Sequence, residues 1–165
     1  MTMRKWVIAL VCCLLVGMLV GCAPRADVFD TFSGSYTAEL TGELYGISFS
    51  ARLEREAAEG TGASAATVTF YAPDLLSGTT VTRSATGEIT VVSGGLSLPD
   101  AGGIGAALFS LFPTSGEITD TALTEEGYTR VTGEGFVLTL LSDGTPLDIE
   151  TDAVRATVVK WEKRS

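Results

Sequence analysis

Few side chains in this sequence are suited to covalent or acid–base chemistry. The chain has no histidine, and its three cysteines, Cys12, Cys13 and Cys22, all lie near the N-terminus. The rest of the chain therefore lacks the commonest general base, the commonest metal ligand and the best thiol nucleophile. A serine–lysine pair would need a desolvated lysine, but Lys160 and Lys163 lie in a polar C-terminal segment. We therefore expect a protein that is not an enzyme.

The acidic residues are the other candidates for chemistry. Twenty Asp and Glu residues against 11 Lys and Arg give a formal net charge of −9. Carboxylates can bind calcium or act in pairs on glycosides, which leaves both alternatives open on composition. No loop has the Asp-x-Asp-x-Asp-Gly pattern of a calcium site, and no acidic pair is flanked by the aromatic residues of a sugar site. We predict no metal, no cofactor and a surface that repels nucleic acid.

Cys22 is the cysteine with a chemical context. It ends the tetrapeptide Leu19-Val20-Gly21-Cys22. This tetrapeptide closes an apolar run that starts at residue 6, directly after the basic residues Arg4 and Lys5. That run is shorter than the roughly 20 residues that a membrane-spanning helix needs. The arrangement resembles the lipobox of bacterial lipoproteins, where a small residue admits the protease that cuts before the cysteine.

This resemblance implies where in the cell the protein is located. Residues 1–21 would be a signal peptide, and the Cys22 thiol would carry a diacylglyceryl group, because two acyl chains anchor a protein stably. We predict a protein anchored by lipid to the cell membrane on its extracytoplasmic side, with a tether at 22–31 and one domain at 32–165. An uncleaved N-terminal anchor is the alternative. Removal of Cys12 and Cys13 with the signal leaves no disulfide in the domain.

From residue 32 onward the hydrophobic pattern is that of a β protein. Apolar and polar residues alternate around Tyr36 to Leu40 and again from Tyr45 to Leu53, which predicts two strands joined by a turn at 41–44 around Gly42. Further strands are predicted at 67–72, 79–83, 88–92, 96–98, 117–123, 128–133, 135–141, 147–151 and 154–161. So many antiparallel strands in one domain must curl, because a wide open sheet twists and exposes its edges.

One segment between these strands has a helical pattern instead. Ile104, Ala107, Leu108, Leu111 and Phe112 share a helical spacing between a glycine pair and a proline, which predicts a short apolar helix at 104–112. The preceding glycines lack the lysine of a phosphate-binding loop, so we interpret them as a hinge. The predicted fold class is mainly β, an antiparallel half-barrel or incomplete barrel with one short apolar lid helix.

Together these elements are similar to the lipoprotein-carrier fold of LolA and LolB. The resemblance rests on the lipobox, the step from Pro73 to Gly78, the glycine-hinged apolar helix and the Gly144-Thr145-Pro146 turn. It implies an incomplete barrel with a helical lid over an apolar cavity. The candidate ligand-binding residues, for which plain core is the alternative, are Phe70, Leu108, Phe109, Phe112 and Phe136.

The predicted function is therefore non-enzymatic binding of lipid or another hydrophobic ligand at the membrane surface. Barrels of this size can hold a small apolar ligand. The alternative is a protein-interaction module of the cell envelope that uses an exposed sheet edge or its acidic face.

Overall fold

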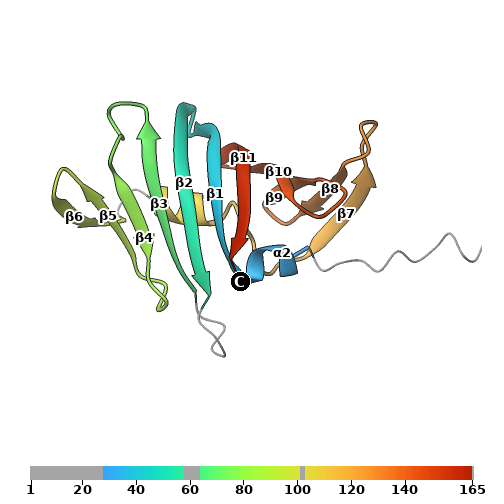
Figure 1. Ribbon diagram of the computed structural model, residues 1–165, viewed down its shortest axis with the longest axis horizontal. Helices are drawn as coiled ribbons and strands as arrows, with labels where there is room; N and C mark the ends of the chain where they lie inside the picture. The colour runs from blue at the N-terminus through green and yellow to red at the C-terminus, as the bar shows by residue number, and fades with distance from the viewer. Residues whose placement is uncertain (1–27, 58–63, 101–102, 165) are drawn as a thin grey trace, which may run out of the picture.

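The computed structural model describes residues 28–57, 64–100 and 103–164, which form one antiparallel sheet and two short helices (Figure 1). The predicted signal peptide, Cys22 and Gly102 of the predicted hinge lie outside the described residues. The first half of the sheet contains β1 (Ser35–Leu44), β2 (Ile47–Ala57), β3 (Ser64–Ala72), β4 (Thr80–Arg83), β5 (Ile89–Ser93) and β6 (Leu96–Pro99). The second half contains β7 (Ile118–Leu123), β8 (Thr129–Gly133), β9 (Phe136–Leu140), β10 (Pro146–Thr151) and β11 (Val154–Arg164).

The sheet consists of two meanders joined by its first and last strands. The strand order is β6-β5-β4-β3-β2-β1-β11-β10-β9-β8-β7, so each strand pairs with its sequence neighbour and β1 also pairs with β11. The two edges, β6 and β7, do not pair with each other, and the sheet stays open. The predicted mainly β, antiparallel and incomplete barrel is therefore confirmed.

The predicted turn at 41–44 is wrong, and the reason is a close contact between backbones. β1 continues through Gly42 to Leu44, and the chain reverses at Tyr45 and Gly46, which have φ angles of 49° and 79°. A Cβ atom on Gly42 would lie 2.0 Å from the carbonyl oxygen of Arg155 in β11. Gly42 is thus needed for the approach of two strands rather than for a turn.

The two helices are short and both contribute apolar side chains to the core. α2 (Asp30–Ser33) places Phe32 in a helical turn instead of at the start of a strand. α3 (Ile104–Phe109) is shorter than the predicted 104–112, because the chain leaves the helix at Ser110, ahead of Pro113. Leu111 and Phe112 are nevertheless buried.

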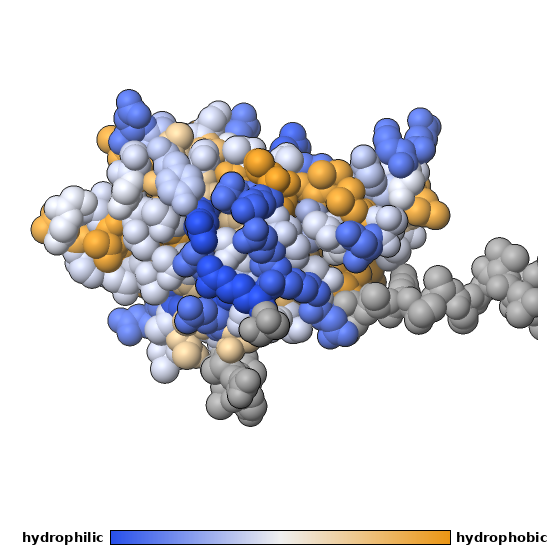
Figure 2. All heavy atoms as spheres, viewed as in Figure 1, coloured by the Kyte–Doolittle hydropathy of each residue, from blue (hydrophilic) through white to orange (hydrophobic). Residues whose placement is uncertain are grey.

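The two faces of the sheet differ in chemistry. Along the long strands buried and more exposed positions alternate, so every second side chain points to an apolar inner face. α3 lies against the inner face of β4 and β5, behind the sheet in Figure 1. Hydrophilic residues gather on the outer face over β1, β2 and β11 in Figure 2, where Arg52, Glu54, Lys160, Glu162 and Arg164 form ion pairs.

Candidate ligand-binding face

The five predicted ligand-binding residues are all buried, and they lie in three parts of the molecule. Phe70 is on the inner face of β3 and packs edge-on against Phe49. Leu108 and Phe109 belong to α3, and Phe112 follows it on the inner face. Phe136, on β9 in the other meander, packs edge-on against Phe29, with ring centroids 6.3 Å apart. The structure thus brings the three residues of the lid segment together and leaves Phe136 in a separate contact.

The lid segment, residues 104–112, lies tightly on the first meander. A Cβ atom on Gly105 would be 2.4 Å from Ile89 Cγ2 and 2.8 Å from Val81 Cγ1, so the glycine lets the helix approach β4 and β5 closely. The Ala106 amide donates to the Asp100 carboxylate at 3.0 Å. The lid segment is therefore held mainly by side-chain packing, with a polar contact at its start.

An aromatic cluster closes the inner face where the two meanders meet. The Tyr36 and Trp161 rings stack with centroids 4.3 Å apart, and Phe32 and Phe112 each pack within 6 Å of Trp161. These rings come from β1, β11, α2 and the lid segment. Aromatic pairs of this kind stabilise by about 0.5–1.5 kcal/mol beyond their buried area. The cluster therefore ties the lid segment to the central strands.

Two arginines lie on the inner face, and sequence reasoning missed both. Arg55 of β2 follows Phe49, Ala51 and Leu53 in the inward alternation and is only 6% exposed. Arg83 of β4 is half-buried, and its guanidinium carbon lies 4.9 Å from the centre of the Phe109 ring. The signal that could have revealed them is a charge at an inward position of a predicted strand.

Neither arginine has a carboxylate partner in the part of the chain that the structure describes, whereas Arg52, Arg155 and Arg164 do. The buried Nε atoms of Arg52 and Arg55 both have no hydrogen-bond acceptor among the described residues, but only Arg52 has a carboxylate partner there. A buried charge is costly unless it is paired and hydrogen-bonded. The inner face therefore carries unbalanced positive charge in a chain of formal net charge −9.

Tyr36 lies between these charges and the aromatic cluster. Its hydroxyl group is beside the Arg55 side chain. Burial raises the pKa of Tyr36 to about 12, although the Arg55 and Arg83 cations favour the tyrosinate and lower it. Burial and the nearby Arg55 charge both lower the pKa of Arg83. The three polar groups are thus close enough to influence one another in a desolvated setting.

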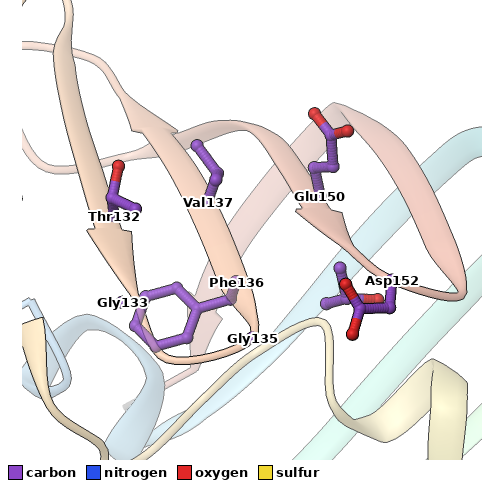
Figure 3. Close-up of a pocket in the computed structure, with 8 residues that line it drawn as sticks. Thr132, Gly133, Gly135, Phe136, Val137, Glu150 and Asp152 are labelled. Carbon is purple, nitrogen blue, oxygen red and sulfur yellow. The ribbon is translucent and has the colours of Figure 1, made fainter. Parts of the chain in front are cut away.

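Two shallow hollows on the second meander have both polar and apolar residues in their lining. One of about 400 Å³ lies at the ends of β8, β9 and β10 and includes Phe136, whose ring packs over Gly133 (Figure 3). A second, of about 280 Å³, runs beside Arg130, Asp148 and Glu150. Among the predicted ligand-binding residues only Phe136 lines either hollow. Leu108, Leu111 and Phe112 of the lid segment are buried against the sheet, so a ligand must displace these side chains to reach the surface beneath them.

The described residues hold no cluster of three or more side chains suited to a metal ion. Across residues 28–57, 64–100 and 103–164, no helix has the length and hydrophobicity to cross a membrane.

The similarities of this chain to known proteins are similarities of three-dimensional structure. No protein-family model and no curated protein matches the chain. An uncharacterized conserved protein from Thermus thermophilus matches with a TM-score of 0.54 and 15% identity, over 84% of this chain and 83% of its own. MucB matches with a TM-score of 0.53 and 16% identity, over 88% of this chain and 60% of its own.

The structures that match also include a LolA superfamily protein from Nitrosomonas europaea, with a TM-score of 0.42 and 8% identity, over 87% of this chain and 95% of its own. The predicted mainly β fold agrees with the matches to the Thermus thermophilus protein and MucB. Because the identities to the Thermus thermophilus protein and MucB are below 25%, what this chain shares with these two proteins is a fold.

Proposed function

We propose that this protein is a non-enzymatic binder of lipid or another hydrophobic ligand, anchored to the extracytoplasmic side of the cell membrane through Cys22. The observation that carries the proposal is the continuous apolar inner face of an open sheet, which the short lid segment covers in place of a closed barrel wall. An open sheet can admit a chain-shaped ligand by movement of one segment, without breaking strand pairs.

The binding step follows from the contacts of the lid segment. Its inward side chains, Leu108, Leu111 and Phe112, are fully or almost fully buried against the sheet. When the segment moves away, acyl chains replace its side chains on the same surface, so the apolar area stays out of water. Phe70 lies on this surface in β3, and we propose that it contacts the ligand together with the lid residues. Phe136 would contact a ligand that extends to the second meander.

Lipid loading tests this proposal. The chain carrying Cys22→Ser behind a cleavable signal is incubated with phospholipid vesicles, and native mass spectrometry measures bound lipid. We expect one discrete lipid-sized mass, which Phe109→Asp abolishes because a carboxylate cannot take the buried place of the Phe109 ring in the lid helix. Tyr71→Asp is the matched control, since Tyr71 is an exposed aromatic next to Phe70 on β3. If the Cys22→Ser chain without a further substitution is folded by circular dichroism and binds no lipid, the proposal is contradicted.

The anchor has its own test. Residues 1–21 are proposed as the signal peptide and 22–31 as the tether, of which Val28 and Phe29 already pack against the core. Cys22→Ser removes the thiol that would accept the diacylglyceryl group, so we expect either a soluble protein or an uncleaved precursor. Metabolic labelling with a fatty acid measures acylation. Labelled, mature protein in the variant would disprove the anchor at Cys22.

The second candidate function is binding of an envelope protein at the edge strand β6. Leu96 and Leu98 of this strand are 67% and 56% exposed, and among the described strands β6 pairs with β5 alone. An unpaired edge is a template for a further strand. MucB, one of the proteins of similar fold, is known in complex with MucA. A photo-crosslinker at Leu98 would then capture one defined partner in intact cells, and one at Leu123 on the opposite edge would not.

A further inference from the structure

The two inner-face arginines and Tyr36 occupy one row across the sheet. Tyr36 pairs with Arg55 between β1 and β2, Arg55 pairs with Ala66 of β3, and Ala66 pairs with Arg83 of β4. Arg55 and Arg83 are therefore two strands apart, a separation of about 10 Å between Cα atoms. Two long side chains on the same face at that separation can reach one small anion between them.

The chemistry of this row calls for a negative group. Arg55 is 6% exposed and its Nε atom has no acceptor, while Arg83 has no ion pair among the described residues. Guanidinium groups match phosphate oxygens in geometry and bind them with charge-assisted hydrogen bonds. The Tyr36 hydroxyl group adds a neutral donor beside them, because burial raises its pKa to about 12. An anion between the two cations would reduce the repulsion between them.

Building on the proposed function, we infer that Arg55, Arg83 and Tyr36 form a site for the phosphate head group of an anionic amphiphile whose acyl chains lie under the lid segment. The position of the row supports the link between head and tail. Arg83 contacts Phe109 of the lid helix, and Tyr36 contacts Phe112 at the end of the lid segment. A ligand held by its phosphate at this row would direct its chains along the apolar inner face.

Isothermal titration calorimetry on the full chain in dodecyl maltoside tests the inference with three probes. These are dioctanoyl phosphatidylglycerol, dioctanoyl phosphatidylcholine and inorganic phosphate. We expect phosphatidylglycerol to bind at least tenfold more tightly than phosphatidylcholine, and Arg55→Gln and Arg83→Gln each to remove most of that preference. Arg52→Gln is the matched control, because Arg52 lies on the outer face of the same strand and pairs with Glu54. It should leave both affinities unchanged.

Arg55→Lys separates the effect of losing the positive charge from the effect of a disturbed fold. This variant keeps the positive charge and should retain at least half of the binding free-energy preference for phosphatidylglycerol, while Arg55→Gln does not. Circular dichroism confirms that each variant is folded, and Arg83, being half-buried, offers a second position with less risk to the core.

The outcomes distinguish this inference from the proposed function. Equal affinities for the two lipids, or a phosphatidylglycerol preference that survives both glutamine variants, would overturn the head-group site and leave lipid binding intact. If inorganic phosphate binds as tightly as phosphatidylglycerol, the ligand is free phosphate, and the proposal of an amphiphilic ligand is overturned. If neither lipid binds, both the site and the proposed function fail.

Discussion

Arg52 and Arg55 lie three residues apart on one strand, so their side chains face opposite sides of the sheet. Arg52 is on the outer face and pairs with Glu54 at 2.8 Å, while Arg55 is buried on the inner face with no carboxylate partner among the described residues. Exposed ion pairs such as the first contribute about 0–1 kcal/mol. A buried charge without a partner lowers stability. The outer face thus carries exposed, paired charges, while the inner face keeps a buried charge without a carboxylate partner among the described residues.

The largest expected effect comes from the apolar packing of the inner face. Leu138→Ala on β9 removes a side chain that is fully buried, so the free energy of unfolding should fall by about 2–5 kcal/mol. Val159→Ala on β11 is the outer-face control, because Val159 is 62% exposed, and it should change stability by less than about 0.5 kcal/mol. Urea unfolding measures both values, and similar losses for the two variants would erase the distinction between the faces.

Next in size is the pH dependence due to Tyr36. Its pKa is about 12 in the folded protein, against 10.0 for an unperturbed tyrosine, so folding favours the protonated form. This stabilisation is fully present below about pH 10 and is lost as the pH rises through about 12, by an amount on the order of 3 kcal/mol. Urea unfolding between about pH 9 and 12 should show this loss for the wild type and a flatter profile for Tyr36→Phe. An unchanged profile in the variant would show that other groups cause the loss.

A smaller effect is expected at the contact between the lid helix and the sheet. Gly105→Val places new atoms against Ile89 and Val81, which should cost about 1–3 kcal/mol and lift the helix from the sheet. Gly34→Val is the matched control, because nothing lies within 4 Å of a Cβ atom there. Binding of 1-anilinonaphthalene-8-sulfonate reports exposed apolar surface and should rise only for Gly105→Val. A rise in both variants would show that it does not come from the lid.

The smallest effect sharpens the arginine comparison itself. Arg55→Met replaces a buried charge with an apolar side chain, so stability should stay equal or rise by about 1 kcal/mol. Arg52→Met breaks an exposed pair and should lower it by less than about 1 kcal/mol. Thermal unfolding of the two variants gives the sign of each change. A loss of several kcal/mol in Arg55→Met would show that Arg55 stabilises the fold instead of serving a ligand.

Much of the strand pattern could be predicted because it depends on local chemistry. Period-two alternation located the strands on both sides of the apolar helix, and Asp143-Gly144 marked the turn between β9 and β10, where Gly144 has a φ of 81°. The five candidate residues were identified from hydrophobicity alone, and all of them are buried. Hydrophobicity could not separate ligand-contacting residues from core residues, because a side chain that lines a cavity and one that fills a core are equally apolar.

The sequence by itself determined where the chain is extended, where it turns and which segment is helical and apolar, since these depend on neighbouring residues. Only the tertiary structure decided that β1 pairs with β11, that Gly42 meets the Arg155 backbone, and that Arg55 and Arg83 share one row of the inner face. Such contacts join residues far apart in the chain. They arise from strand register, which is set when two meanders bury one common apolar face, and no short stretch of sequence contains that information.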